Sequence, residues 1–343
     1  MGDARTMTTE RSTGLDCGRA VAVIAVVFGH VQTLSSTTTA YDVAVRFAVP
    51  FFFLLSGYFF RAPAGPLTPA LRRLAIRTLG PFALWLAIYL LWFQPPASDW
   101  RSPIFLAKLV VQGGPAHHLW FLPSLAVSSA LLLVLLKRGA GAGVIAAVAA
   151  GLYVVGLLFG SYHDVVFGGG FFWNTRNGPF FGFPFMAIGW LIARRTVRPT
   201  LEAALWILLA GAVLHAGEIL TLDRFGVRFE HDQLLGTLPY ALGFFLVAMN
   251  APRNAATSLL ARLGPYSLGV YCVHLLAIEG VQAALAHTAP ALGTMPYLVG
   301  FLAASASLGF CVALARVPAL APLVRTGRGR PERGTPSLVP AAG

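Results

Sequence analysis

Charged residues are scarce in this chain of 343 residues, and their scarcity excludes an ordinary soluble protein. Asp, Glu, Lys and Arg together make up 11% of the sequence, whereas hydrophobic residues make up 57%. Soluble globular domains carry about 25% charged residues. The mean hydropathy of +0.71 points the same way. We therefore predict an all-α fold, a polytopic integral membrane helix bundle.

Cysteine is also scarce, and acidic residues are fewer than basic ones. Cys17, Cys272 and Cys311 fall in apolar segments without paired spacing, which argues against a disulfide framework and a cysteine metal site. His117 and His118 are adjacent and point in different directions on a helix, so no metal site is expected there either. The formal net charge is +12. Because the basic residues occupy short loops between apolar runs, membrane topology explains this charge better than binding of nucleic acid.

About ten apolar segments are long enough to be membrane spans. A span needs about 20 mostly apolar residues. Hydropathy places the segments at 15–34, 43–60, 79–94, 119–136, 143–160, 179–193, 203–221, 233–249, 266–286 and 297–315. We expect them to form one transmembrane domain at 15–315, with an N-terminal tail at 1–14 and a basic tail at 316–343. From Arg325 onward the tail is rich in Pro, Gly and Arg, which is typical of disordered chain.

The distribution of basic residues indicates how the spans are oriented. Of the 25 Lys and Arg residues, 18 lie on the side that carries both termini and six lie on the other side. The positive-inside rule therefore predicts a multi-pass protein of the plasma membrane with both termini in the cytoplasm. It also predicts that the loop at 61–77 is cytoplasmic and that the segment at 161–176 faces outward.

The first predicted span carries two ionisable residues that lie on the same face of a helix. Arg19 and His30 are 11 positions apart, so on a helix they lie on one stripe, within about 20° of each other and roughly 16 Å apart along the axis. Charge inside a membrane is costly unless it faces protein or water, so the pair indicates a polar bundle interior. His30 can exchange a proton near neutral pH, which makes it the candidate general base. Arg19 stays protonated and can either bind phosphate or pair with Asp16.

Three arginines precede the third predicted span. Arg72, Arg73 and Arg77 lie within six residues and form a candidate anion site for a phosphorylated ligand. Positive-inside charge or contact with lipid headgroups is the simpler alternative.

Other polar and aromatic residues in or beside the spans are candidates for binding the substrate. His215 and Glu218 share one helix face, as do Tyr271 and His274. Each pair alone is more often structural, whereas together they indicate a polar bundle interior. The substrate-binding candidates are Asp16, Ser56, Tyr58, His118, Trp120, Arg176, Asn177, Glu218, Tyr271 and His274.

The spacing of the first span resembles the signature of the acyltransferase-3 family, which is an arginine, ten residues and a histidine. Further landmarks of that family follow in order: SGY at 56–58, HLWFL at 118–122, TRNGPFFGFPFMAIGW at 175–190 and LGPYSLGVYCVH at 263–274. The resemblance covers nearly all of the predicted spans and leaves out the tails.

Members of this family transfer acyl groups, usually acetyl, from coenzyme A to hydroxyls of sugars, polysaccharides or natural products. The resemblance therefore implies a membrane O-acyltransferase with acetyl-CoA as its donor, no metal, and a glycan or other hydroxyl compound as its acceptor. It also implies that His30 is the essential histidine, with Arg19 as its functional partner and Arg73 and Arg77 as contacts to coenzyme A. The stretch around Arg176 is most similar to the branch that acts on cell-envelope sugars.

Other functions remain compatible with the sequence. The acceptor can instead be a small natural product such as a macrolide, or the chain can be a transporter or flippase for a glycan precursor. Transporters often have internal repeats with broken spans at matching positions, and the sequence shows no such correspondence. The acyl-chain length, a covalent acyl-enzyme, the side on which the acceptor binds and the oligomeric state are left open.

Overall fold

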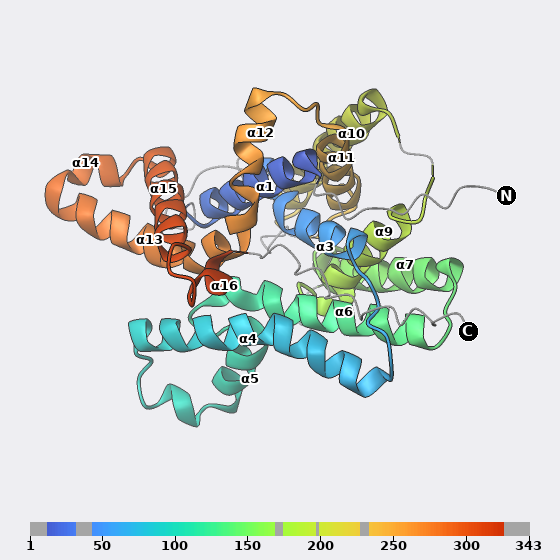
Figure 1. The fold of residues 1–343 in the computed structure, drawn as a ribbon, viewed down its shortest axis with the longest axis horizontal. Helices are drawn as coiled ribbons and strands as arrows, with labels where there is room; N and C mark the ends of the chain where they lie inside the picture. The colour runs from blue at the N-terminus through green and yellow to red at the C-terminus, as the bar shows by residue number, and fades with distance from the viewer. Residues whose placement is uncertain (1–11, 32–42, 169–173, 197–198, 227–232, 326–343) are drawn as a thin grey trace, which may run out of the picture.

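A computed structural model describes residues 12–31, 43–168, 174–196, 199–226 and 233–325, and all regular secondary structure in these ranges is helical. Figure 1 shows helices packed around α1 and α3, with α4 and α5 along one edge and α13 to α15 at another. The predicted all-α fold is therefore confirmed.

Seven helices are long and apolar enough to cross a membrane. They are α1 (Thr13–Val31), α4 (Leu67–Phe93), η3 with α6 (His117–Trp120 and Phe121–Lys137), α7 (Ala142–Phe159), α10 (Leu201–Arg224), the segment Ala255–Thr288 that ends in α13 (Ser267–Thr288), and α15 (Pro296–Leu314). All ten predicted spans coincide with helices, but the count of ten spans is not confirmed. The three that remain are α3 (Ala48–Tyr58), η4 with α9 (Gly178–Gly182 and Phe183–Ile192) and α11 (Thr237–Asn250). These helices are too short for a bilayer core about 30 Å thick.

Short helices connect or cover the longer ones. They are η2 (Asp99–Arg101), α5 (Pro103–Gln112), α8 (His163–Phe167), α12 (Ala255–Ala261), η5 (Gly264–Tyr266), α14 (Pro290–Gly293) and α16 (Ala321–Val324). Val324 of α16 is fully buried, and a Cβ on Gly269 of α13 would lie 2.5 Å from its carbonyl oxygen. The first part of the predicted C-terminal tail is thus packed on the bundle. The part predicted to be disordered lies almost wholly in 326–343, outside the described residues.

The third span begins earlier than its hydropathy predicts. The sequence analysis placed it at 79–94, after a loop at 61–77, whereas α4 begins at Leu67. Pro69 is compatible with this start because the first turn of a helix does not use its backbone N–H groups. Arg72, Arg73 and Arg77 therefore lie on the first turns of α4 and not in a loop.

Local sequence explains where α1 begins and ends. The hydroxyl of Ser12 accepts a hydrogen bond from the backbone N–H of Leu15 at 3.4 Å, as an N-cap residue does. Asp16 in the first turn complements the positive end of the helix dipole. Small buried residues, Ala20 and Ala22, let neighbouring helices approach α1 closely.

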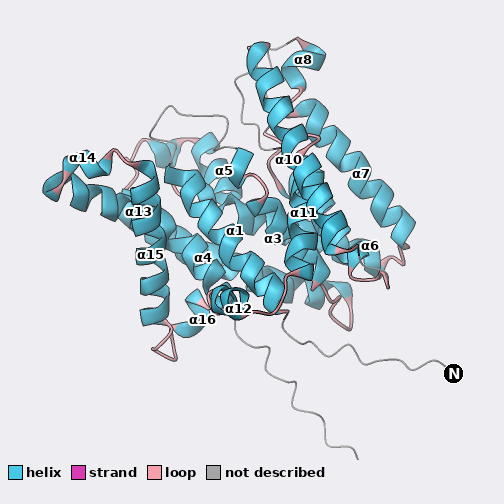
Figure 2. Ribbon diagram, turned by 90° about the horizontal axis from the view of Figure 1, so that it is seen from above, coloured by secondary structure: helices cyan, strands magenta, loops and turns pink. Residues whose placement is uncertain are grey.

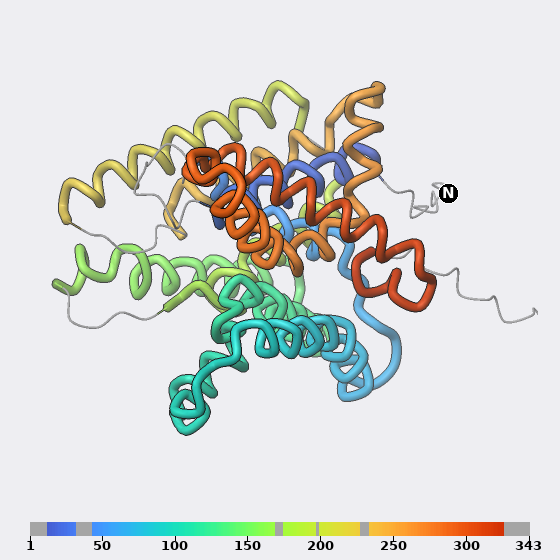
Figure 3. The backbone as a smooth tube through the Cα atoms, turned by 90° about the vertical axis from the view of Figure 1, so that its left-hand side faces the viewer, coloured from blue at the N-terminus to red at the C-terminus, as the bar shows by residue number. Residues whose placement is uncertain are grey.

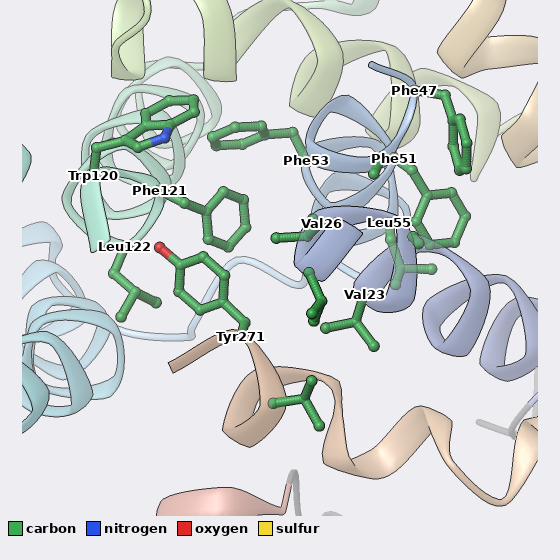
Figure 4. Close-up of a cluster of buried hydrophobic side chains, with 14 of the residues drawn as sticks. Val23, Val26, Phe47, Phe51, Phe53, Leu55, Trp120, Phe121, Leu122 and Tyr271 are labelled. Carbon is green, nitrogen blue, oxygen red and sulfur yellow. The ribbon is translucent and has the colours of Figure 1, made fainter. Parts of the chain in front are cut away.

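The hydrophobic core lies where α1 and α3 meet α6, α11 and α13. The ring of Phe53 lies 4.7 Å from the ring of Phe121, and both point into this core (Figure 4). Figure 4 also shows valines of α1 facing aromatic residues of α3 and Tyr271 of α13. Because Phe51, Phe53 and Leu54 are completely buried, α3 is an interior helix. Interior position explains why so short a helix has such an apolar sequence.

Paired helices surround this core. The pair α10 and α11 lies on one flank, and α13 and α15 pack against each other and against α1 on another (Figures 2 and 3). Helix α4 lies beside α6 and continues toward α13, where the hydroxyl of Tyr89 donates a hydrogen bond to Cys272 O at 2.9 Å. Residues far apart in the sequence are therefore brought together around α1.

Two glycines allow α3 and α9 to touch through their backbones. A Cβ on Gly57 would lie 1.8 Å from Met186 O, and a Cβ on Gly189 would lie 1.9 Å from Leu54 O. No side chain fits at such distances, so close contact depends on glycine at both positions.

We predict that Gly57→Ala destabilises the protein by about 1–3 kcal/mol, because an added methyl group forces α3 away from α9. Thermal unfolding in detergent measures the loss. Gly151→Ala is the matched control, since Gly151 is also inside a helix but its Cβ would meet no atom within 4 Å. Equal unfolding temperatures for Gly57→Ala and the parent protein would contradict the role given to this contact.

Candidate active site

Four histidine rings from three segments gather at the end of α1, and we call them the histidine cluster. His30 lies in the last turn of α1, His117 and His118 lie in η3, and His274 lies in α13. The ring centre of His30 is 4.7 Å from that of His274. It is 5.8 Å from the ring of His117 and 6.2 Å from the ring of His118. His274 is also 4.8 Å from His118, so it is the near neighbour of both.

The histidine cluster runs from the surface into the interior. His117 is exposed and His30 is half-buried. His118 and His274 expose only 1% and 0% of their surface. The hydroxyl of Tyr271 donates a hydrogen bond to the backbone oxygen of His118, which ties η3 to α13.

Backbone hydrogen bonds fix which ring nitrogen can accept a proton. Nδ1 of His30 lies 2.9 Å from Val26 O, and Nδ1 of His274 lies 2.6 Å from Tyr271 O. A carbonyl oxygen can only accept, so each Nδ1 must carry the hydrogen. The lone pair of His30 is therefore on Nε2, and that nitrogen is the one that can act as a base.

Two arginines from other elements act on His30, Arg46 just before α3 and Arg176 just before η4. Arg46 and Arg176 are both close enough to interact electrostatically with His30. The guanidinium carbon of Arg176 lies 5.1 Å from the centre of the Trp120 ring, which holds it beside η3. The site thus combines a basic nitrogen with two positive charges, a combination that suits a reaction in which negative charge develops on oxygen.

Arg19 contacts a different set of residues near the other end of α1. Its Nη1 lies 2.9 Å from Oδ1 of Asp16, which is the intrahelical pair considered from the sequence. Its guanidinium carbon lies 5.7 Å from the ring centre of Phe59. Arg19 and His30 share one helix, and the 11 positions between them correspond to roughly 16 Å along its axis. The Arg19 site therefore lies apart from the histidine cluster.

The predicted phosphate site lies at this same end of the bundle. Phe59 leads directly into the connection to α4, where Arg72, Arg73 and Arg77 are exposed. Nη2 of Arg73 donates a hydrogen bond to Ala64 O at 3.1 Å. The three side chains are accessible to a soluble ligand, and their assignment to coenzyme A stays a prediction.

Several other predicted residues have contacts within the bundle. Asn177 caps η4, since its Oδ1 accepts from Phe180 N at 3.2 Å. Ser56 donates to Phe52 O at 2.7 Å in the preceding turn, and Tyr58 packs on Phe245. Substrate contacts of these residues stay predictions.

Glu218 connects α10 to the start of α11. Its carboxylate accepts hydrogen bonds from Gly236 N at 2.6 Å, from Leu235 N at 3.1 Å and from the hydroxyl of Tyr162. Burial, followed by the bond to Glu218, raises the pKa of Tyr162, so its hydroxyl stays protonated and donates. Neighbouring His215 bonds to Thr237 at 3.1 Å. These contacts support a structural role for Glu218, and the predicted substrate contact gains no support from them.

We predict that Glu218→Gln lowers the free energy of unfolding by about 1–3 kcal/mol, because the amide places a donor against backbone donors. Glu202→Gln is the matched control, since Glu202 is exposed in the first turn of the same helix. Thermal unfolding of both variants in detergent makes the comparison. If the two variants unfold at the same temperature, Glu218 does not join the two helices.

Two features of the site were missed from the sequence. Arg46 was counted only for topology, although a basic residue inside the predicted span at 43–60 was itself a signal of function. Residues 178–182 form a π-helix, η4, and Gly182 N donates to Asn177 O at 3.0 Å. Buried Gln233 supports this turn by donating to Phe180 O at 3.0 Å. Single π-turns often occur at functional sites, but they could not be predicted from the pattern of this sequence.

The histidine cluster does not have the arrangement of a metal site. Among the residues in the described ranges, no three His, Cys, Asp or Glu side chains are grouped so as to hold an ion.

Two curated proteins with similarity to this chain are both named as racemases. The chain is 28% identical over 296 residues to a serine/alanine racemase from Enterococcus gallinarum. It is 26% identical over 303 residues to an amino-acid racemase from Enterococcus faecalis. The alignments cover 79% and 80% of this chain but only 42% of each relative, so the chain spans about two fifths of their length. No solved structure matches the chain significantly.

A family match also covers most of the sequence. Residues 12–316 match the acyltransferase-3 family, described as an acyltransferase domain. This range contains α1, the histidine cluster and all seven helices that are long enough to cross a membrane. The chain belongs to the acyltransferase-3 family and has several helices that are long and apolar enough to cross a membrane.

Proposed function

We propose that the protein is an O-acyltransferase that moves an acyl group, most simply acetyl, from acyl-CoA to a hydroxyl of a sugar, polysaccharide or glycolipid. The observation that carries the proposal is the histidine cluster, in which a backbone hydrogen bond on Nδ1 of His30 leaves Nε2 as the basic nitrogen. Two arginines within electrostatic range supply positive charge beside it.

In the proposed reaction, Nε2 of His30 takes the proton of the acceptor hydroxyl. The oxygen attacks the thioester carbon of acyl-CoA, the C–S bond breaks, and coenzyme A leaves as a thiolate. The proton then passes from His30 to the thiolate. Arg46 and Arg176 stabilise the negative charge that develops on the carbonyl oxygen during the attack.

The donor binds from the end of the bundle that carries Arg19 and the first turns of α4. Arg72, Arg73 and Arg77 contact its phosphates, and Arg19 lies between them and the histidine cluster. The 11 residues from Arg19 to His30 correspond to roughly 16 Å of helix. The thioester must therefore reach along α1, which suits a donor with a long flexible arm.

Labelled acetyl-CoA, purified protein and a panel of acceptors test the proposal. The panel contains cell-envelope glycans, a macrolide and serine, because the similar proteins are named for amino-acid racemisation. Transfer of label to a glycan hydroxyl supports the proposal. Label on the macrolide or on serine alone assigns another acceptor class. Movement of a glycan precursor across proteoliposomes without transfer supports the transporter alternative.

We predict that the connection 61–66 faces the cytoplasm and that α8 faces outward, from the uneven distribution of basic residues. In a variant without native cysteines, Ala62→Cys should resist a membrane-impermeant thiol reagent added to intact cells. Val165→Cys should react with the same reagent, since both positions are exposed. Labelling of position 62 from outside would reverse this topology.

A further inference from the structure

The buried part of the histidine cluster holds two acceptor nitrogens for which the described residues provide no donor. Nε2 of His274 and Nδ1 of His118 are buried and lack a hydrogen-bond partner among the residues in the described ranges. Each ring uses its other nitrogen on a backbone carbonyl, His274 on Tyr271 O and His118 on Cys272 O. A buried acceptor without a donor is costly, so two in one cluster indicate that a donor arrives during function.

The spacing of the rings identifies where that donor comes from. Two imidazole rings joined by one hydrogen bond have centres about 5 Å apart, because their nitrogens lie about 3 Å apart. The rings of His30 and His274 are 4.7 Å apart and inclined at 66°. The rings of His274 and His118 are 4.8 Å apart. Nε2 of His274 can therefore accept a hydrogen bond from a protonated His30, whereas the free nitrogen of His118 is itself an acceptor and supplies no donor.

The positive charges around His30 favour a neutral hydrogen-bond acceptor beside it. Arg46, Arg176 and His117 all act on His30 from other elements, and the positive charge of the two arginines opposes its protonation. A neutral imidazole that accepts a hydrogen bond offsets this repulsion without adding charge. His274 is the ring nearest to His30 and can serve in this way.

We propose that His274 is a positioning residue whose Nε2 accepts a hydrogen bond from His30 once His30 has taken a proton. The inference rests on the proposed function, in which that proton comes from the acceptor hydroxyl. The hydroxyl O–H bond breaks and an N–H bond forms at His30 Nε2. That N–H then donates to the lone pair of His274 until the proton moves to the departing thiolate. Nothing is oxidised or reduced, and His274 ends unchanged.

His274→Gln and His274→Asn separate this role from a structural one. The amide of Gln occupies the position of Nε2 and can still accept from His30. The amide of Asn occupies the position of Nδ1 and can only replace the bond to Tyr271 O. We expect Asn to lower kcat at least tenfold and Gln to retain more of it. His287→Gln, an exposed substitution on the same helix, is the control and should leave activity unchanged.

The pH dependence of the reaction distinguishes the two roles further, because a purely structural role of His274 would leave it unchanged. Without an acceptor, protonated His30 is less stable, so His30 becomes neutral at lower pH. The acid limb of the pH–rate profile should shift to lower pH by about one unit in His274→Asn. Diethyl pyrocarbonate, which modifies neutral histidine, should show the same shift at His30 by peptide mass spectrometry.

This second measurement does not require acyl transfer. If the parent protein transfers no acyl group, the proposed function fails while the coupling of His30 to His274 is still tested by the reagent. An unchanged pH midpoint at His30 in His274→Asn overturns the inference, as does an Asn variant more active than Gln. Should Asn fail to fold in detergent, the midpoint in His274→Phe replaces it, with the same shift expected.

Discussion

Replacing His30 with Ala should slow acyl transfer by a factor of about 10² to 10⁴ while the protein stays folded, because a general base contributes this much to a reaction rate. His30 is half-buried at the end of α1, and the hydrogen bond from its Nδ1 to Val26 O lies within its own helix. Loss of this bond does not separate α1 from another helix. The measurements are transfer from labelled acyl-CoA and thermal unfolding in detergent.

His30→Gln distinguishes catalysis from support of the bundle. Glutamine keeps hydrogen-bonding capacity and similar bulk but does not exchange a proton near neutral pH. Catalysis predicts an inactive, stable Gln variant, whereas a supporting role predicts a largely active one. His163→Gln is a suitable control, because His163 is also buried but lies in α8, where its Nδ1 bonds to Asp164. A stable His30→Gln protein with near-normal transfer would exclude His30 as the base.

The combined substitution of Arg73 and Arg77 by Ala should raise the apparent KM for acyl-CoA by at least tenfold for each arginine. A charge-assisted hydrogen bond to phosphate accounts for an effect of this size. The KM for the acceptor should change much less, since both arginines are exposed at the start of α4. Steady-state kinetics with each substrate varied in turn measures the difference.

Arg253→Ala provides the control for general loss of positive charge, because Arg253 is exposed in the connection between α11 and α12. Its KM values should match those of the parent protein. If the double variant behaves like this control, the arginines of α4 serve topology or lipid contact and not the donor.

Hydropathy predicted helices well but could not tell which of them span a membrane. All ten predicted spans coincide with helices, because apolar runs in this chain are separated by polar or glycine-rich segments. Helix α3 has a span-like composition for another reason, since most of its side chains are buried against other helices. The start of α4 was missed because its first turns are basic, and hydropathy assigns such turns to loops.

The histidine cluster was predictable in part. The sequence selected His30 because it lies on one stripe with Arg19, and His274 because it shares a helix face with Tyr271. His118, Trp120 and Arg176 were selected as polar or aromatic residues in or beside the spans. The sequence could not show that these residues meet, since His30 and His274 are separated by most of the chain. Two other predicted site residues contact different partners: Arg19 pairs with Asp16, and Glu218 bonds to the start of α11. Sequence spacing fixes which residues share a helix face, but tertiary packing decides which faces meet.

The position of Arg19 and His30 on one unbroken helix has a consequence for how the sequence can change. One residue inserted between them would turn His30 by about 100° around the axis of α1 and move it by about 1.5 Å, away from His274. Substitutions between the two positions leave the phase of the helix intact. The length of this segment is therefore under a stricter constraint than its composition, and a change of length would uncouple the two ends of α1 even if every side chain were kept.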